Sequence, residues 1–151
     1  MSRVIYSPVL VFHQGYFYLV KEQVERNEKL IADYAEWMKQ NKLSEKTINK
    51  HLNNVSLFAN DFLLYSEITP IEKGHIQIDY YFDYWFKRKV MSSVTDLKEN
   101  ITSIKKFYTY LNSVNKISKI DLDEMNFYIK KAKGDWIKNA NNYFDDLMED
   151  Y

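Results

Sequence analysis

One amphipathic stretch, Leu43–Tyr65, constrains the fold of this chain more than any other. It starts at Ser44, whose short oxygen-bearing side chain suits a helix N-cap. Apolar residues then recur at steps of three and four, which is the pattern of one buried helical stripe. They are Ile48, Leu52, Val55, Ala59 and Phe62. The opposite side is polar and mildly basic, so the pattern predicts a helix from about residue 44 to residue 66.

The same pattern recurs 48 to 49 residues later. Any two amphipathic helices share a period, but matched Trp, Ser and Thr spacings favour a true repeat. Trp37, Ser44 and Thr47 match Trp85, Ser92 and Thr95, and Leu52, Val55, Phe58 and Phe62 match Ile101, Ile104, Phe107 and Leu111. Each unit is a short aromatic helix, a loop with Ser and Thr, and a long amphipathic helix. Two units predict two helical hairpins that pack face to face.

The rest of the chain completes an all-α prediction of about five to six helices in a single domain, 1–151. Residues 1–20 form either a short irregular arm or a β-hairpin turning at His13-Gln14-Gly15, because Pro8 argues against a helix there. Helices are expected over 22–41, 76–90 and 95–112, with a loop at 67–74. Residues 121–149 are read as a C-terminal extension of two helices separated by Gly134, with Asp121 or Asp123 as the first cap. Ser93 and Asp96 fit a capping box.

Composition points to a cytoplasmic protein. The 151 residues include no cysteine, which excludes disulfides and thiolate metal sites. No apolar run approaches the roughly 18 residues of a membrane span, and the first residues lack a signal-peptide pattern. We therefore expect no membrane partner.

The sequence carries no sign of an active site. Its three histidines, His13, His51 and His75, do not stand at metal-ligand spacings, and His51 is expected to be a solvated or packed side chain. No nucleophile elbow, Walker loop, dinucleotide fingerprint or zinc-protease motif occurs. We expect no catalytic residues, no metal and no cofactor.

Charge is balanced overall but unevenly placed. The net charge is zero, whereas residues 37–51 carry a local excess of three positive charges and residues 87–106 an excess of four. Helix N-termini with nearby hydroxyls and lysines hold phosphates well. The two repeats have such starts at Ser44, Lys46, Thr47 and Lys50, and at Ser92, Ser93, Thr95 and Lys98. Ordinary helix capping and solubility are the alternative explanation.

The region 22–117 resembles the SAM-like core-binding domain of tyrosine recombinases, the phage integrases. The motifs are loose, and their order and spacing carry the resemblance. They are Trp37, Leu43-Ser44-Glu45-Lys46-Thr47, Phe58–Leu63, Ser92–Thr95 and Phe107-Tyr108-Thr109-Tyr110-Leu111. The resemblance implies two crossed helical hairpins that clamp one side of duplex DNA. It implies contacts from Ser44, Lys46, Thr47 and Lys50, and from Thr95, Lys98, Lys105 and Lys106.

The recombinase catalytic set is missing. The residues after Ile117 contain no arginine, and Tyr151 has no catalytic neighbours. We therefore expect a non-catalytic protein of DNA recombination or integration that binds double-stranded DNA through its backbone. The alternative is a protein-interaction or self-associating module that uses the aromatic helix Tyr80–Phe86 or the C-terminal helices.

Overall fold

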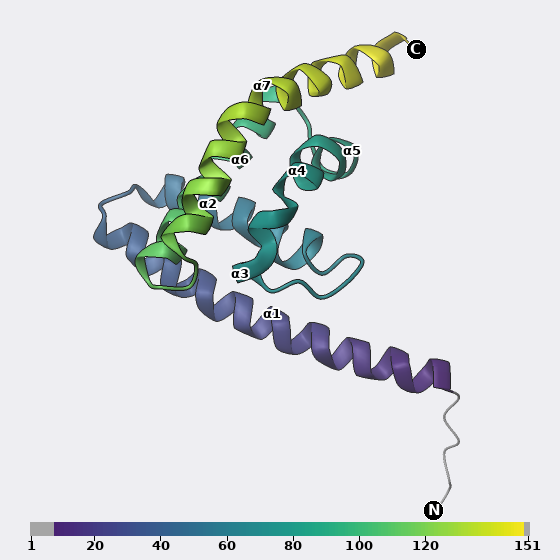
Figure 1. Ribbon diagram of the computed structural model, residues 1–151, viewed down its shortest axis with the longest axis vertical. Coiled ribbons are helices and arrows are strands. Elements are labelled where there is room, and N and C mark those ends of the chain that lie inside the picture. Colours follow the sequence, from purple (N-terminus) through teal and green to yellow (C-terminus); the bar gives the residue numbers. More distant parts are fainter. Residues whose placement is uncertain (1–7, 150–151) are drawn as a thin grey trace, which may run out of the picture.

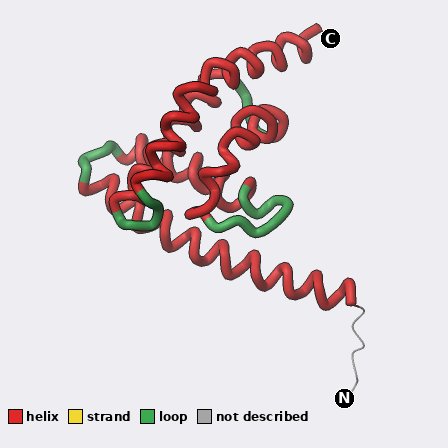
Figure 2. The backbone as a smooth tube through the Cα atoms, in the orientation of Figure 1, coloured by secondary structure: helices red, strands yellow, loops and turns green. Residues whose placement is uncertain are grey.

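The computed structural model describes residues 8–149 as helices joined by short loops, with no strand among them (Figures 1 and 2). The all-α prediction is confirmed, and the helices form five segments. The first is α1 (Pro8–Gln40), and the second is α2 (Glu45–Ser56) with its π-helical continuation η1 (Leu57–Phe62). The third runs through α3 (Ile71–Gly74), η2 (His75–Gln77), α4 (Ile78–Tyr80), η3 (Tyr81–Trp85) and α5 (Phe86–Lys89). The last two are α6 (Val94–Ser113) and α7 (Lys119–Glu149).

The two amphipathic helices begin where the sequence predicts. The Ser44 hydroxyl accepts the Thr47 backbone N–H at 3.2 Å, and the Ser93 hydroxyl accepts that of Asp96 at 3.1 Å. In a capping box the side chain of the third helical residue also accepts the backbone N–H of the N-cap residue. Here the Asp96 carboxylate instead accepts the backbone N–H of Ser92, the residue before the cap, at 3.3 Å. These bonds satisfy amides that a helix start leaves without partners.

Both predicted stripes line the core. On the first repeat Ile48, Val55, Ala59 and Phe62 are buried and Leu52 is half-buried; on α6 Leu97, Ile101, Ile104, Tyr108 and Leu111 are buried. Rings join the segments, since Phe58 and Phe62 of η1 lie with ring centroids 4.9 and 4.8 Å from Tyr81 of η3. Burial of these large apolar side chains is the main stabilising term of such a bundle.

The N-terminal prediction is wrong. The chain is helical from Pro8 onward, and Gly15 lies inside α1 rather than in a hairpin turn or an arm. Proline is tolerated in the first turn of a helix, where its missing N–H would have no partner in any case. Pro8 therefore starts the helix that it seemed to exclude. Residues 1–7, the rest of the expected arm, lie outside the described residues, as do 150 and 151 and with them Tyr151.

Three boundaries also differ from the sequence prediction. α7 continues through Gly134 as one helix, and its start is capped by the Ser118 hydroxyl, which accepts the Asp121 N–H at 3.1 Å. Packing of Ile129, Trp136 and Ala140 on either side of Gly134 outweighs the cost of about 1 kcal/mol of an interior glycine. The predicted helix 44–66 ends at Phe62, and the predicted loop 67–74 turns helical at residue 71.

The helices pack in the order α1, α2, α6, α7. The N-terminal part of α1 and the C-terminal part of α7 extend beyond this bundle (Figure 1). None of the helices in residues 8–149 combines the length and apolar character needed to cross a membrane.

Candidate nucleic-acid interface

α2 and α6 meet through a polar cluster. The Ser103 hydroxyl is 2.8 Å from Nδ1 of His51 and accepts a hydrogen bond from the Asn54 amide at 2.9 Å. His51 is only 8% exposed, so it is a packed histidine rather than a solvated one. Burial, then Lys106 and Lys50, lower the pKa of His51 below its usual value. A neutral imidazole therefore fills the junction between the helices.

A small cleft opens beside this cluster. It has a volume of about 180 Å³ and is lined by Thr47, Lys50 and His51 of α2 with Glu99 and Thr102 of α6. The Lys50 ammonium forms an ion pair with the Glu99 carboxylate across the cleft. Two of the predicted site residues, Thr47 and Lys50, thus face α6 directly.

Equivalent positions of the two repeats touch each other here. Lys50 and Glu99 are 49 residues apart, and so are Asn54 and Ser103, which is the spacing of the sequence repeat. The second contact lies four residues further along the chain than the first on both helices, so α2 and α6 run parallel where they meet. The N-terminal turns of α2 and α6 therefore lie on the same side of the contact, and their positive dipole ends share that side.

Lysines flank the cleft on both helices. Lys46 precedes Lys50 by one turn, and Lys98 and Lys105 lie on the outer side of α6 with Thr102. All three of these lysines are exposed. Lys106 is half-buried, with its ammonium 5.8 Å from the centre of the Trp37 ring. These four lysines together with Thr47, Lys50, Glu99 and Thr102 are called the α2/α6 face below.

The predicted serines and Thr95 lie outside the cleft, in the first turns of their helices. The Ser44 hydroxyl is engaged with the backbone N–H and the hydroxyl of Thr47, the latter at 2.9 Å. Ser92 and Thr95 are exposed at the start of α6. Capping accounts for Ser44, whereas Lys46, Lys98 and Lys105 are exposed.

Sequence reasoning missed the α6 side of the cleft. Glu99, Thr102 and Ser103 were not singled out, because each is an ordinary polar residue on an amphipathic helix. The repeat held a usable signal, since it aligns Glu99 with Lys50 and Ser103 with Asn54.

The aromatic helix is mostly core. Tyr81, Phe82, Trp85 and Phe86 are buried, and the helix packs on two sides, with Tyr81 against η1 and Phe82 against Trp136 of α7. Tyr80 and Tyr84 are about half exposed and stack on each other with centroids 5.0 Å apart. Packing thus explains four of the six rings in this segment.

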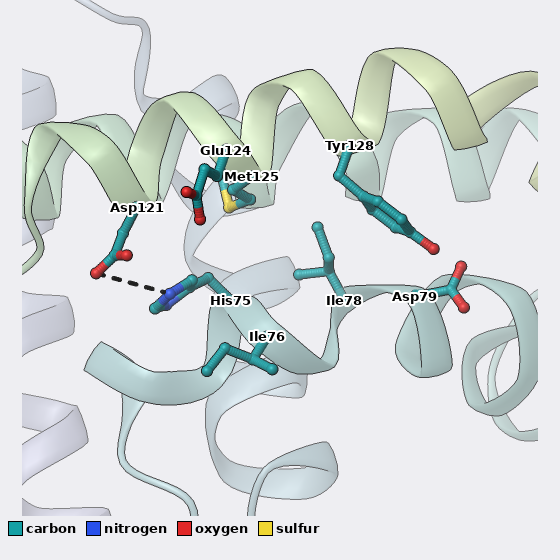
Figure 3. A pocket seen from close by; sticks show the side chains of 8 residues that line it. All are labelled: His75, Ile76, Ile78, Asp79, Asp121, Glu124, Met125 and Tyr128. Carbon is teal, nitrogen blue, oxygen red and sulfur yellow. Dashed lines mark ion pairs between the residues drawn. The ribbon is translucent and has the colours of Figure 1, made fainter.

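A larger cavity of about 520 Å³ lies between α7 and the segment His75–Tyr80 (Figure 3). Asp79, Asp121 and Glu124 line it, and Nε2 of His75 lies 4.0 Å from the Asp121 carboxylate. Asp79 is held by the Trp136 indole N–H at 2.8 Å. Three carboxylates repel phosphate, so this cavity does not belong to a nucleic-acid interface. In the described part of the chain, no group of three or more His, Asp or Glu side chains is placed to hold a metal ion.

Comparison of the chain with protein-family models, curated proteins and solved structures found no match.

Proposed function

We propose that this protein binds double-stranded DNA through the α2/α6 face, without catalysing a reaction on it. The supporting observation is that α2 and α6 pack side by side, with their N-terminal turns on one side of the contact and exposed lysines on both helices. Lysines and helix N-termini are the groups that hold backbone phosphates.

The chemistry of this face favours backbone contacts over base readout. Its cations are lysines, which act as flexible point charges and lack the planar fork with which arginine recognises guanine. Phosphate contacts release counterions, so affinity should fall steeply as salt rises. We infer a sequence-tolerant binder, and the resemblance to integrase core-binding domains suggests DNA recombination or integration as its setting.

The test compares two triple variants on a fluorescent duplex of arbitrary sequence. Lys46, Lys98 and Lys105 are changed to Ala in one variant. Lys116, Lys130 and Lys138, exposed lysines outside α2 and α6, are changed in the matched control. Both lose the same net charge. The first variant should weaken binding and reduce the slope of log K against log salt by about 2.7, which is about 0.9 per phosphate contact. The control should bind like wild type.

If the two triple variants have the same duplex affinity and the same salt slope, DNA does not bind at the α2/α6 face. Absence of binding by wild type at low salt would reject the DNA proposal outright. Melting temperatures should stay unchanged, because all six side chains are exposed.

The non-catalytic part of the proposal has its own measurement. Pure protein incubated with supercoiled plasmid and divalent metal should neither relax nor cut it. Plasmid relaxation that disappears in Tyr151→Phe would contradict this part of the proposal.

A second candidate is a protein-interaction or self-association module. It is favoured by the exposed Tyr80 and Tyr84 stack and by Leu147 and Met148, which are 42% and 76% exposed near the end of α7. A concentration series by size exclusion with light scattering tests it. A dimer that Leu147→Ser/Met148→Ser or Tyr80→Ser/Tyr84→Ser abolishes, in a protein that does not bind duplex, would favour this function.

A further inference from the structure

The cleft of the α2/α6 face holds the right groups for an anion but is occupied by an acid. Thr47 contributes a hydroxyl and Lys50 a cation, which are common partners of a phosphate oxygen, while the Thr102 hydroxyl donates to the Lys98 carbonyl at 3.1 Å. Glu99 supplies the competing anion, because its carboxylate pairs with the Lys50 ammonium. The cleft volume of about 180 Å³ leaves room for one small group.

The ion pair is easily exchanged. The Lys50 and Glu99 side chains are 47% and 39% exposed, so water screens their attraction. Exposed pairs of this kind contribute little to folding stability, and many contribute nothing measurable. A phosphate that approaches Lys50 therefore competes with a weakly held carboxylate, but it also meets the negative charge of that carboxylate.

The repeat shows what is unusual about Glu99. Position 50 of the first copy is a lysine, and the equivalent position 99 of the second copy is an acid. A base at both positions would place two like charges together at the helix contact. The acid removes that repulsion and at the same time cancels one cation of the binding face.

We propose that this cleft is the seat of one backbone phosphate of DNA and that Glu99 limits affinity by competing with the phosphate for Lys50. This inference rests on the proposed DNA binding. It assigns Glu99 a regulatory role at the face rather than a structural role in the fold. Loss of the Glu99 charge should open the cleft to phosphate.

The experiment measures duplex binding by Glu99→Gln and by the matched control Glu45→Gln. Glu45 is an exposed acid in the first turn of α2 that lies outside the α2/α6 face, so both variants remove one negative charge but only Glu99→Gln removes it from the cleft. Glu99→Gln should tighten binding at least fivefold at 50 mM salt and steepen the salt slope by about 0.9, because one more phosphate is neutralised. Glu45→Gln should tighten binding less and leave the slope unchanged.

A second comparison tests the role of Lys50. In a Lys50→Ala background, Glu99→Gln should relieve repulsion but should add nothing to the salt slope, since no cation remains to accept the phosphate. Circular dichroism melts of all variants should match wild type, which separates binding from folding.

The outcomes separate the two proposals. If wild type binds duplex but Glu99→Gln and Glu45→Gln behave alike, the phosphate seat is wrong and DNA binding stands. If neither wild type nor Glu99→Gln binds at low salt, DNA binding itself fails. Binding by Glu99→Gln alone would reject DNA binding by wild type and, with it, this inference.

Discussion

At the scale of single residues, the titration of His51 should make the folding stability of the protein depend on pH. Its imidazole is buried against Ser103, and its pKa is lowered by burial and by two lysines. The unfolded chain should titrate near 6.5, so below that pH the unfolded state binds a proton that the folded state resists. Stability contributed by the neutral ring is complete above pH 6.5 and is lost as pH falls.

We therefore expect the free energy of unfolding of wild type to fall between pH 7.5 and pH 5.5 more steeply than that of His51→Gln. Urea denaturation at several pH values measures both curves. The difference between them isolates His51 from the other titrating groups. Parallel curves would mean that His51 does not resist protonation in the folded state.

Two loop residues hold a conformation that suits glycine. Lys42 and Asn115 have φ angles of 62° and 60°, and each follows a helix that ends with matching bonds. The Leu43 N–H donates to the Met38 carbonyl at 3.2 Å, and the Lys116 N–H donates to that of Leu111 at 2.8 Å. This is the Schellman motif, which usually places glycine at the left-handed position.

Replacing Lys42 by Gly should raise the free energy of unfolding by about 0.5–1 kcal/mol, because it relieves the Cβ strain at a smaller entropic cost. Asn115→Gly should gain less, since asparagine tolerates this conformation. Chemical denaturation gives both values. Lys42→Ala is the control and should change little, as alanine keeps the Cβ.

At the scale of helices, Gly134 of α7 and Gly74 of α3 differ in whether their surroundings leave room for a side chain. A methyl group on Gly134 would meet no atom within 4 Å, whereas one on Gly74 would lie 2.6 Å from Leu63 Cδ1 and 2.8 Å from the Tyr108 hydroxyl. That hydroxyl donates to the Ile71 carbonyl at 2.8 Å. Gly74 is therefore needed for packing and Gly134 is not.

Gly134→Ala should stabilise the protein by about 1 kcal/mol through helix propensity. Gly74→Ala should destabilise it by about 1–3 kcal/mol, since the added methyl overpacks the site and displaces the Tyr108 hydroxyl. Thermal and urea unfolding of the two variants measure the contrast. A stabilising Gly74→Ala would show that Leu63 and Tyr108 can shift at no cost.

Periodicity predicted the helices whose apolar stripes face the core, and residue type at the helix starts predicted the caps at Ser44 and Ser93. It failed where local signals and tertiary packing disagree. Gly134 has the propensity of a breaker, but buried Ile129 and Trp136 hold α7 together across it. Pro8 reads as an interruption if it is placed in a helix interior, but proline is also favoured as the first residue of a helix, which is where the structure has it.

The candidate face was only half predictable for a related reason. Lysines at helix starts follow from the sequence, whereas the Lys50 and Glu99 pair depends on how two distant helices meet. The repeat relates these positions but does not by itself say that they touch.

At the scale of the whole molecule, two long helices reach past a compact bundle. α1 has 33 residues and α7 has 31, so each spans about 45–50 Å. Buried residues occur in α7 only up to Ala140, and near the start of α1 Tyr18 and Leu19 are more than half exposed. Residues 15–22 and 141–149 contain no buried side chain. Their contacts with the bundle include the Tyr16 hydroxyl, which donates to the Leu64 carbonyl at 3.2 Å, and half-buried Phe144, which packs against the core.

Native-state hydrogen exchange should therefore be uneven. Amides of residues 16–21 and 141–149 should exchange through local opening, far faster than those of 101–111 in α6, which should require global unfolding. Mass spectrometry of timed exchange samples measures this directly. Uniform protection along α1 and α7 would indicate that both projecting ends are covered in solution, which would favour the self-association candidate.

Because Lys106 lies over the Trp37 ring, the intrinsic tryptophan fluorescence of the protein should report on binding at the α2/α6 face. Of the three tryptophans, Trp85 and Trp136 are 6% and 1% exposed, while Trp37 is partly exposed at the α2/α6 face. A polyanion that draws the Lys106 ammonium away from the indole changes the electric field at that ring alone. Intrinsic emission of the unlabelled protein should then respond to a ligand on this face.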